Sequence, residues 1–98
     1  MILKVATFRT HCTNKQQIMK VAEEVLEAFT AWQMCEAITV LADRCLADAD
    51  SLEVAEIELA DEIADVITAA CNLAERYCID MKAAMERCEQ RNRDRGRL

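Results

Sequence analysis

Apolar residues recur every three or four positions over most of the chain, which is the period of a helix rather than of a strand. The first such stretch follows Thr13, and either Thr13 with Gln16 or Asn14 with Gln17 has the spacing of a capping box. Residues 1–12 show no clear period and are expected to form an irregular lead-in or a short first helix. The apolar stripe of the predicted helix comprises Ile18, Val21, Ala22, Val25, Phe29 and Trp32.

This stripe does not continue past Trp32. If the same helix went on, Glu36 would lie at the centre of the stripe, whereas Ile38, Leu41 and Cys45 form a new stripe about half a turn away. We therefore expect a break, a kink or a change of packing partner near residues 33–37.

Two further helices are predicted. The segment ADADS at 47–51 is typical of a loop, with Asp50 or Ser51 as the N-cap of a long helix. Asp80 is the expected N-cap of a last helix, which Gly96 ends. We expect acids on the far side of the long helix from its apolar side, which comprises Leu52, Leu59, Ile63, Val66, Ile67, Ala70, Leu73, Ala74 and Tyr77. The expected buried face of the last helix comprises Met81, Ala84, Met85 and Cys88.

Composition supports one small, all-α domain over residues 1–98. The 98 residues include a single Gly and no Pro, and they are rich in good helix formers. A chain of this length buries only about two thirds of the surface that it exposes when unfolded, so few elongated helices can cover one another within it. We expect a four-helix bundle completed by homo-oligomerisation, as a homodimer or a homotetramer.

Charge and targeting signals exclude several classes of protein. A formal net charge of −6 argues against a nucleic-acid binder. No apolar run approaches the ~20 residues that span a bilayer, and the first ten residues lack the apolar segment of a signal peptide, so a cytoplasmic protein without a membrane anchor is expected. The six cysteines lack CxxC spacing and are expected to be reduced. Five arginines crowd the end of the chain, and the Arg-rich tail at 92–98 is expected to be either a local anion site or a solvated tail.

Acidic residues form one stripe on the predicted long helix. Glu58, Asp61, Glu62 and Asp65 stand at i, i+3, i+4 and i+7, and no basic residue nearby on that helix relieves their repulsion. Each like-charge pair costs roughly 0.2–0.5 kcal/mol in an isolated helix. The simplest interpretation is the solvated face of an amphipathic helix.

A second acidic cluster favours another interpretation. Glu24 and Glu27 stand one turn apart on the first predicted helix, with Lys20 as their only nearby basic partner. If the two helices packed antiparallel with these faces opposed, their carboxylates would share one pocket. A hard divalent cation such as Mg²⁺ is the usual reason for a protein to tolerate such a pocket.

The two clusters resemble a known family. EEVLEAF at 23–29 followed by DEIADVI at 61–67 is similar to the EExxE and ExxD signature of MazG-like, all-α nucleoside triphosphate pyrophosphohydrolases, and YCIDMKAAMERCEQRNRDRG is similar to their final helix. The resemblance covers about residues 15–96. It implies a MazG-like bundle that hydrolyses a (d)NTP substrate between the α and β phosphates, to the monophosphate and pyrophosphate, with house-cleaning of nucleotide pools as its role.

Matched by position, the resemblance implies that Mg²⁺, or Mn²⁺ in its place, is held by Glu24, Glu27, Glu62 and Asp65. One of the first two, Glu24 or Glu27, would act as the catalytic proton acceptor. The terminal Asn92 would contact the nucleotide. Lys20 and Arg95, with Arg91 and Arg93 as alternatives, are expected to hold phosphate oxygens.

Two alternatives stay open. The interval between Glu27 and Glu62 is longer than is usual in the family, and Glu58 with Asp61 forms a rival ExxD one turn earlier. The competing function is a noncatalytic helical interaction or adaptor protein with a solvated acidic face. A di-iron carboxylate bundle is disfavoured because it requires Glu-x-x-His on two helices, and the only histidine precedes the first acidic cluster.

Overall fold

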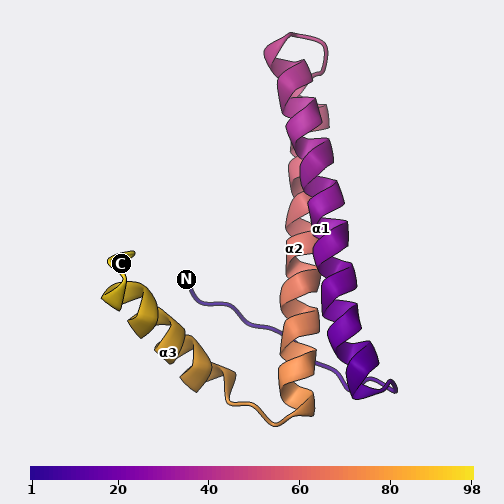
Figure 1. Ribbon diagram of the computed structural model, residues 1–98. Coiled ribbons are helices and arrows are strands. Elements are labelled where there is room, and N and C mark those ends of the chain that lie inside the picture. Colours follow the sequence, from indigo (N-terminus) through magenta and orange to yellow (C-terminus); the bar gives the residue numbers. More distant parts are fainter.

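The computed structural model describes all 98 residues and contains helices but no strands (Figure 1). The three helices are α1 (Asn14–Asp43), α2 (Ala49–Arg76) and α3 (Met81–Asp94). α1 and α2 form a long antiparallel hairpin, whereas α3 extends away from it (Figure 1). The predicted all-α class is therefore confirmed, and a single chain supplies three helices rather than a closed four-helix bundle.

α1 begins at the first of the two predicted capping boxes. The Thr13 hydroxyl accepts from the Gln16 backbone N–H at 3.1 Å, and the Gln16 side chain accepts from the Thr13 N–H at 2.8 Å. The helix then continues for 30 residues without interruption. The predicted break near 33–37 is wrong, and so is the predicted change of packing partner, because the half-buried residues Ala31, Cys35 and Ile38 keep the side of α1 that packs on α2 continuous through this region.

The other helix ends are also set by local hydrogen bonds. The N-cap of α2 is Asp48, which accepts from the Ser51 N–H at 2.8 Å, so the predicted caps Asp50 and Ser51 are wrong and lie within the helix. Asp80 caps α3 as predicted and accepts from the Ala83 N–H at 3.0 Å. Gly96 follows the end of α3 with a φ of 74°, in the left-handed region that favours glycine.

Small, polar and aliphatic residues form the seam between α1 and α2. The buried and half-buried residues alternate in steps of three and four along both helices, which is the pattern of an antiparallel coiled coil. On α1 these are Gln17, Val21, Glu24, Ala28, Ala31, Cys35, Ile38 and Ala42. On α2 the residues that follow this alternation are Leu52, Ala55, Leu59, Glu62, Val66, Ala69, Leu73 and Arg76, while Ile67, Thr68, Cys71, Asn72 and Ala74 are also buried or half-buried outside it.

Most of the large apolar side chains lie outside this seam. Within a single chain the predicted burial of Ile18, Val25, Phe29 and Trp32 is wrong, since each is about half exposed. On α2, Ile63 and Tyr77 are exposed although predicted to be buried, whereas Glu62 lies in the seam rather than on the far side.

The shape of the molecule explains this exposure. The chain measures 50 × 39 × 21 Å, and its thinnest dimension is about two helix diameters. Only six of the 98 residues are buried, and α3 likewise leaves Met81 and Met85 open to solvent. A two-helix layer cannot cover the apolar face of either helix.

The N-terminal segment packs against the open end of the hairpin. Residues 1–12 form an irregular lead-in, which was one of the two predictions for them, and not a short first helix. The Phe8 N–H donates to Asn72 Oδ1 at 2.9 Å. Arg76 donates to the Cys12 carbonyl oxygen, to the Thr10 hydroxyl at 3.1 Å and to Asn14 Oδ1 at 2.6 Å. All six cysteines are free thiols, as expected.

α1 is long and apolar enough to cross a membrane by length and composition alone, and its most apolar stretch is not buried within the chain. One helix of this kind is weak evidence, because the buried core helix of a soluble protein and a signal sequence near the N-terminus pass the same test. The expectation of a protein without a membrane anchor stays a prediction.

Candidate metal centre

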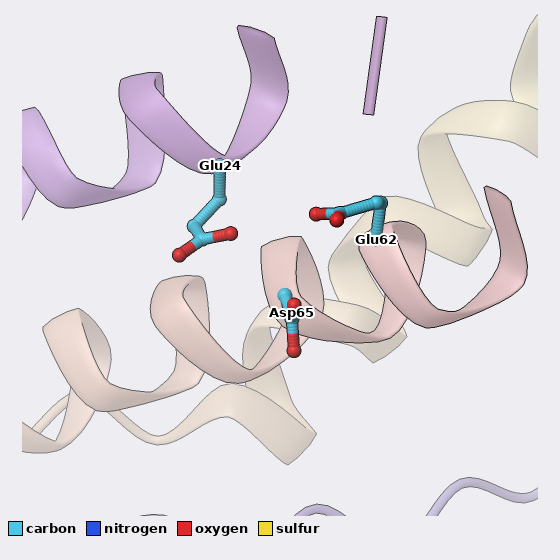
Figure 2. A group of neighbouring side chains, drawn as sticks. All are labelled: Glu24, Glu62 and Asp65. Atoms are coloured by element: carbon cyan, nitrogen blue, oxygen red, sulfur yellow. The ribbon is translucent and has the colours of Figure 1, made fainter. Parts of the chain in front are cut away.

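Three carboxylates from the two helices converge midway along the hairpin (Figure 2). Glu24 comes from α1, Glu62 and Asp65 come from α2, and one oxygen of each lies within 4.8 Å of the other two. Ligand oxygens around an octahedral Mg²⁺ lie about 3–4 Å apart. The three side chains therefore need only small movements to hold one divalent cation.

Glu24 is the most enclosed member of the group. Its side chain is only 9% exposed, because position 24 lies in the seam between the helices. Glu24 Oε2 and Glu62 Oε2 are both buried and have no hydrogen-bond partner. An unpaired buried carboxylate oxygen is costly, so these two atoms mark a place where a cation would be stabilised.

Lys20 supplies the one positive charge beside this group. Its Nζ lies 2.8 Å from Glu24 Oε1 and 3.8 Å from Glu23 Oε2. The hydrogen bond from Lys20 is the main reason that the pKa of Glu24 is lowered, and the same bond is the main reason that the pKa of Lys20 is raised. Lys20 thus favours the ionised form of Glu24.

Glu27 lies next to the three carboxylates but does not belong to the group that converges. The pKa of Glu27 is raised, first because its carboxyl lies close to that of Glu24, and then because of the negative charges of Glu24 and Glu62. Glu27 borders an open cavity of about 520 Å³. The other residues that line this cavity are Glu23, Leu26, Thr30, Ala31, Met34, Glu58 and Glu62.

The geometry distinguishes the two candidate ExxD pairs. Glu62 and Asp65 meet Glu24, whereas Glu58 and Asp61 do not belong to the group. Glu58 borders the cavity one turn away, and Asp61 is exposed. Glu58 was predicted only as a member of the rival ExxD pair, whereas its i, i+4 spacing to Glu62 allows both side chains to lie at the same site.

The other residues expected to bind substrate are divided between two places. Lys20 lies at the carboxylate group, whereas Asn92 and Arg95 lie at the far end of α3, which extends away from the hairpin (Figure 1). The Asn92 side chain accepts from Arg97 Nη1 at 3.2 Å, and Arg95 is exposed. Within one chain these two residues do not approach the carboxylates.

Comparisons of the chain with protein-family models, with curated proteins and with solved structures find no match. The fold and the site together define an α-helical hairpin protein with a carboxylate-rich candidate centre for a divalent cation. The chemistry of that centre is what supports a functional proposal.

Proposed function

We propose that this protein is a Mg²⁺-dependent nucleoside triphosphate pyrophosphohydrolase, which cleaves a (d)NTP between the α and β phosphates. The observation that carries the proposal is the group of three carboxylates, two of which have a buried oxygen with no partner. The MazG-like signature at 23–29 and 61–67 supplies the reaction class, and house-cleaning of nucleotide pools is the corresponding role.

The donor atoms suit a hard cation. Glu24, Glu62 and Asp65 would hold Mg²⁺ or Mn²⁺, with the neighbouring Glu27 as a fourth ligand, and such a set leaves positions for water and for phosphate oxygens. When bound, the cation supplies charge neutralisation of the triphosphate and a lowered pKa of bound water.

Glu27 is the better placed of the two candidate proton acceptors. Glu24 is enclosed and already paired with Lys20, whereas Glu27 borders the open cavity. The cavity volume of about 520 Å³ falls within the range of small-molecule sites, roughly 300–1,000 Å³. We therefore assign to Glu27 the acceptance of a proton from the attacking water, and to the cavity the binding of substrate.

The oligomer belongs to the same proposal. Two hairpins packed through their exposed apolar faces would complete a four-helix bundle, as a homodimer or as half of a homotetramer. Phe29 and Trp32, whose rings stack at a centroid distance of 5.6 Å, supply the largest apolar side chains for this face. Asn92 and Arg95 would then act on the triphosphate of a neighbouring subunit.

The first test is an assay for pyrophosphate release from a panel of ribo- and deoxyribonucleoside triphosphates with Mg²⁺. Wild type is expected to release pyrophosphate from one or more of them. Glu62→Gln should lower the release to background, and Glu27→Gln should lower it by about 10²–10⁴-fold, the usual contribution of a general base. Circular dichroism should show an intact fold in both variants.

Asp61→Asn is the matched control for Glu62→Gln, because it removes the same charge from the adjacent, exposed position. Equal loss of activity in the two variants would contradict the assignment. An interaction protein without catalysis would release no pyrophosphate from any nucleotide. Its melting temperature would also not respond to Mg²⁺ with a nonhydrolysable triphosphate, whereas a ligand site would raise it.

A further inference from the structure

We infer that Lys20 positions the carboxylate of Glu24 for the cation, rather than binding a substrate phosphate. The inference depends on the proposed metal centre and assigns a separate role to one residue of it. It comes from the way in which the two oxygens of Glu24 are used.

The two oxygens of Glu24 have different partners. Oε1 lies 2.8 Å from Lys20 Nζ, whereas Oε2 is buried without a hydrogen-bond partner. Lys20 thereby holds Oε1, which restricts rotation of the Glu24 carboxylate. Oε2 remains free to bind a cation. Partners of this kind orient metal ligands in many proteins, and their loss typically costs 10–100-fold in metal affinity.

The local structure suits this role. Lys20 and Glu24 stand one turn apart on the uninterrupted α1, so the pair depends on a single helix. The Lys20 side chain is 50% exposed while that of Glu24 is 9% exposed, so the lysine reaches from the surface to an enclosed carboxylate. The pairing with Glu23 is longer, at 3.8 Å, and both of its side chains are exposed.

Simple electrostatics makes the opposite prediction. An ammonium group beside a cation site repels the cation, so removal of the Lys20 charge should strengthen metal binding if charge alone mattered. A lysine that only bound phosphate would leave metal affinity without nucleotide unchanged. Of the three roles, only the positioning of Glu24 by Lys20 predicts weaker metal binding when Lys20 is replaced.

The experiment measures Mn²⁺ binding to the full chain by electron paramagnetic resonance, without nucleotide. Lys20→Met is expected to weaken Mn²⁺ binding by 10–100-fold, and Lys20→Arg, which retains a donor, should restore most of it. Lys15→Met is the matched control, because it removes the same charge from an exposed residue of α1 that forms no ion pair. It should not weaken binding.

A double-mutant cycle shows whether Lys20 acts through Glu24. Lys20→Met should have little further effect in a Glu24→Gln background, because the group that it positions is already changed. If Lys20→Met does not fold, Lys20→Gln carries the same prediction.

Unchanged or tighter Mn²⁺ binding by Lys20→Met would overturn the inference while leaving the metal centre in place. Absence of Mn²⁺ binding by wild type would overturn the centre and the inference together. Weakened binding by Lys20→Met in a protein that hydrolyses no nucleotide would support the inference and reject the hydrolase.

Discussion

Glu24 shows most clearly how one residue can serve two purposes. It occupies a seam position, where an apolar side chain would pack best, and its carboxylate is enclosed by the two helices. A buried charge is weak evidence for stability, and buried titratable groups with specific partners cluster at functional sites. The position of Glu24 is therefore better explained by binding than by folding.

Asp48 is the residue whose contribution to stability depends most directly on pH. Its pKa is lowered, first by the nearby Ser51 hydroxyl and then by the hydrogen bond from the Ser51 backbone N–H. A lowered folded-state pKa means that the stabilisation is present above the unfolded-state pKa and is lost as the pH falls through the folded-state value. Asp48→Ala should therefore lower the melting temperature at pH 7, and the difference from wild type should shrink below about pH 4.

Asp48→Asn is the matched variant, since asparagine caps helices as well as aspartate but does not titrate. In thermal melts followed by circular dichroism, the melting temperature of this variant should be close to that of wild type at pH 7. In acid the variant should keep the stability of its cap, which wild type loses. A difference between wild type and Asp48→Ala that stays constant from pH 7 to pH 3 would contradict the assignment of Asp48 as a charged cap.

At the scale of the elements, alanines let α1 and α2 approach closely. Ala55 and Ala69 are 3% and 6% exposed and lie in the seam on either side of Glu62. Carboxylates of both helices can converge only if the helix axes are close. The small residues of the seam and the carboxylate group are therefore parts of one arrangement.

Ala69→Leu tests the close packing of the seam. The added methyl groups should overpack it and lower the free energy of unfolding by about 1–3 kcal/mol, measured by urea denaturation. Ala64→Leu places the same side chain on the exposed side of α2 and should change stability by less than about 0.5 kcal/mol. Equal destabilisation by the two substitutions would show that the seam is not closely packed.

At the scale of the whole molecule, the chain is a thin layer with its large apolar side chains outside. Contiguous apolar surfaces of this kind mark protein or membrane contacts, and a stable protein interface buries about 1,200–2,000 Å² in total. We propose that the exposed aromatic pair and the isolated α3 take part in further packing between chains.

We expect light scattering after size-exclusion chromatography to give the mass of a dimer or tetramer for wild type. The double variant Phe29→Lys, Trp32→Lys should shift this mass toward the monomer, because two charges would be buried at the interface. Leu46→Lys, at an exposed apolar residue of the α1–α2 loop, should leave it unchanged. A monomeric wild type that sediments with lipid vesicles would favour a membrane contact of α1 instead.

Local interactions made part of the fold predictable. The caps at Thr13 and Asp80 depend on side chains within three residues; Asp80 was predicted correctly, and Thr13 was one of the two predicted caps of α1. The cap of α2 was misplaced by two or three residues, because ADADS offers several acceptors and the hairpin loop decides between them.

The candidate site was predictable for the same reason, and only in part. Spacing along one helix placed Glu58, Asp61, Glu62 and Asp65 on one stripe, and only the resemblance to a family signature favoured Glu62 and Asp65 among them. Their meeting with Glu24 depends on the antiparallel packing of the helices. The places of Asn92 and Arg95 relative to this group depend on where α3 packs, which the contacts of one chain do not decide.

The sequence by itself determined that the chain is helical, where α3 begins, where α1 begins to within one residue, and which acids can share a face, because these properties depend on residues within a few positions of one another. Only the tertiary structure decided which face of each helix is enclosed. On α1 the hydrophobic pattern favoured the stripe of Phe29 and Trp32, which is exposed. On α2 it favoured Leu52, Leu59, Val66 and Leu73, which do lie in the seam. Helix spacing depends on the fit of two surfaces, and a one-dimensional pattern does not contain that fit.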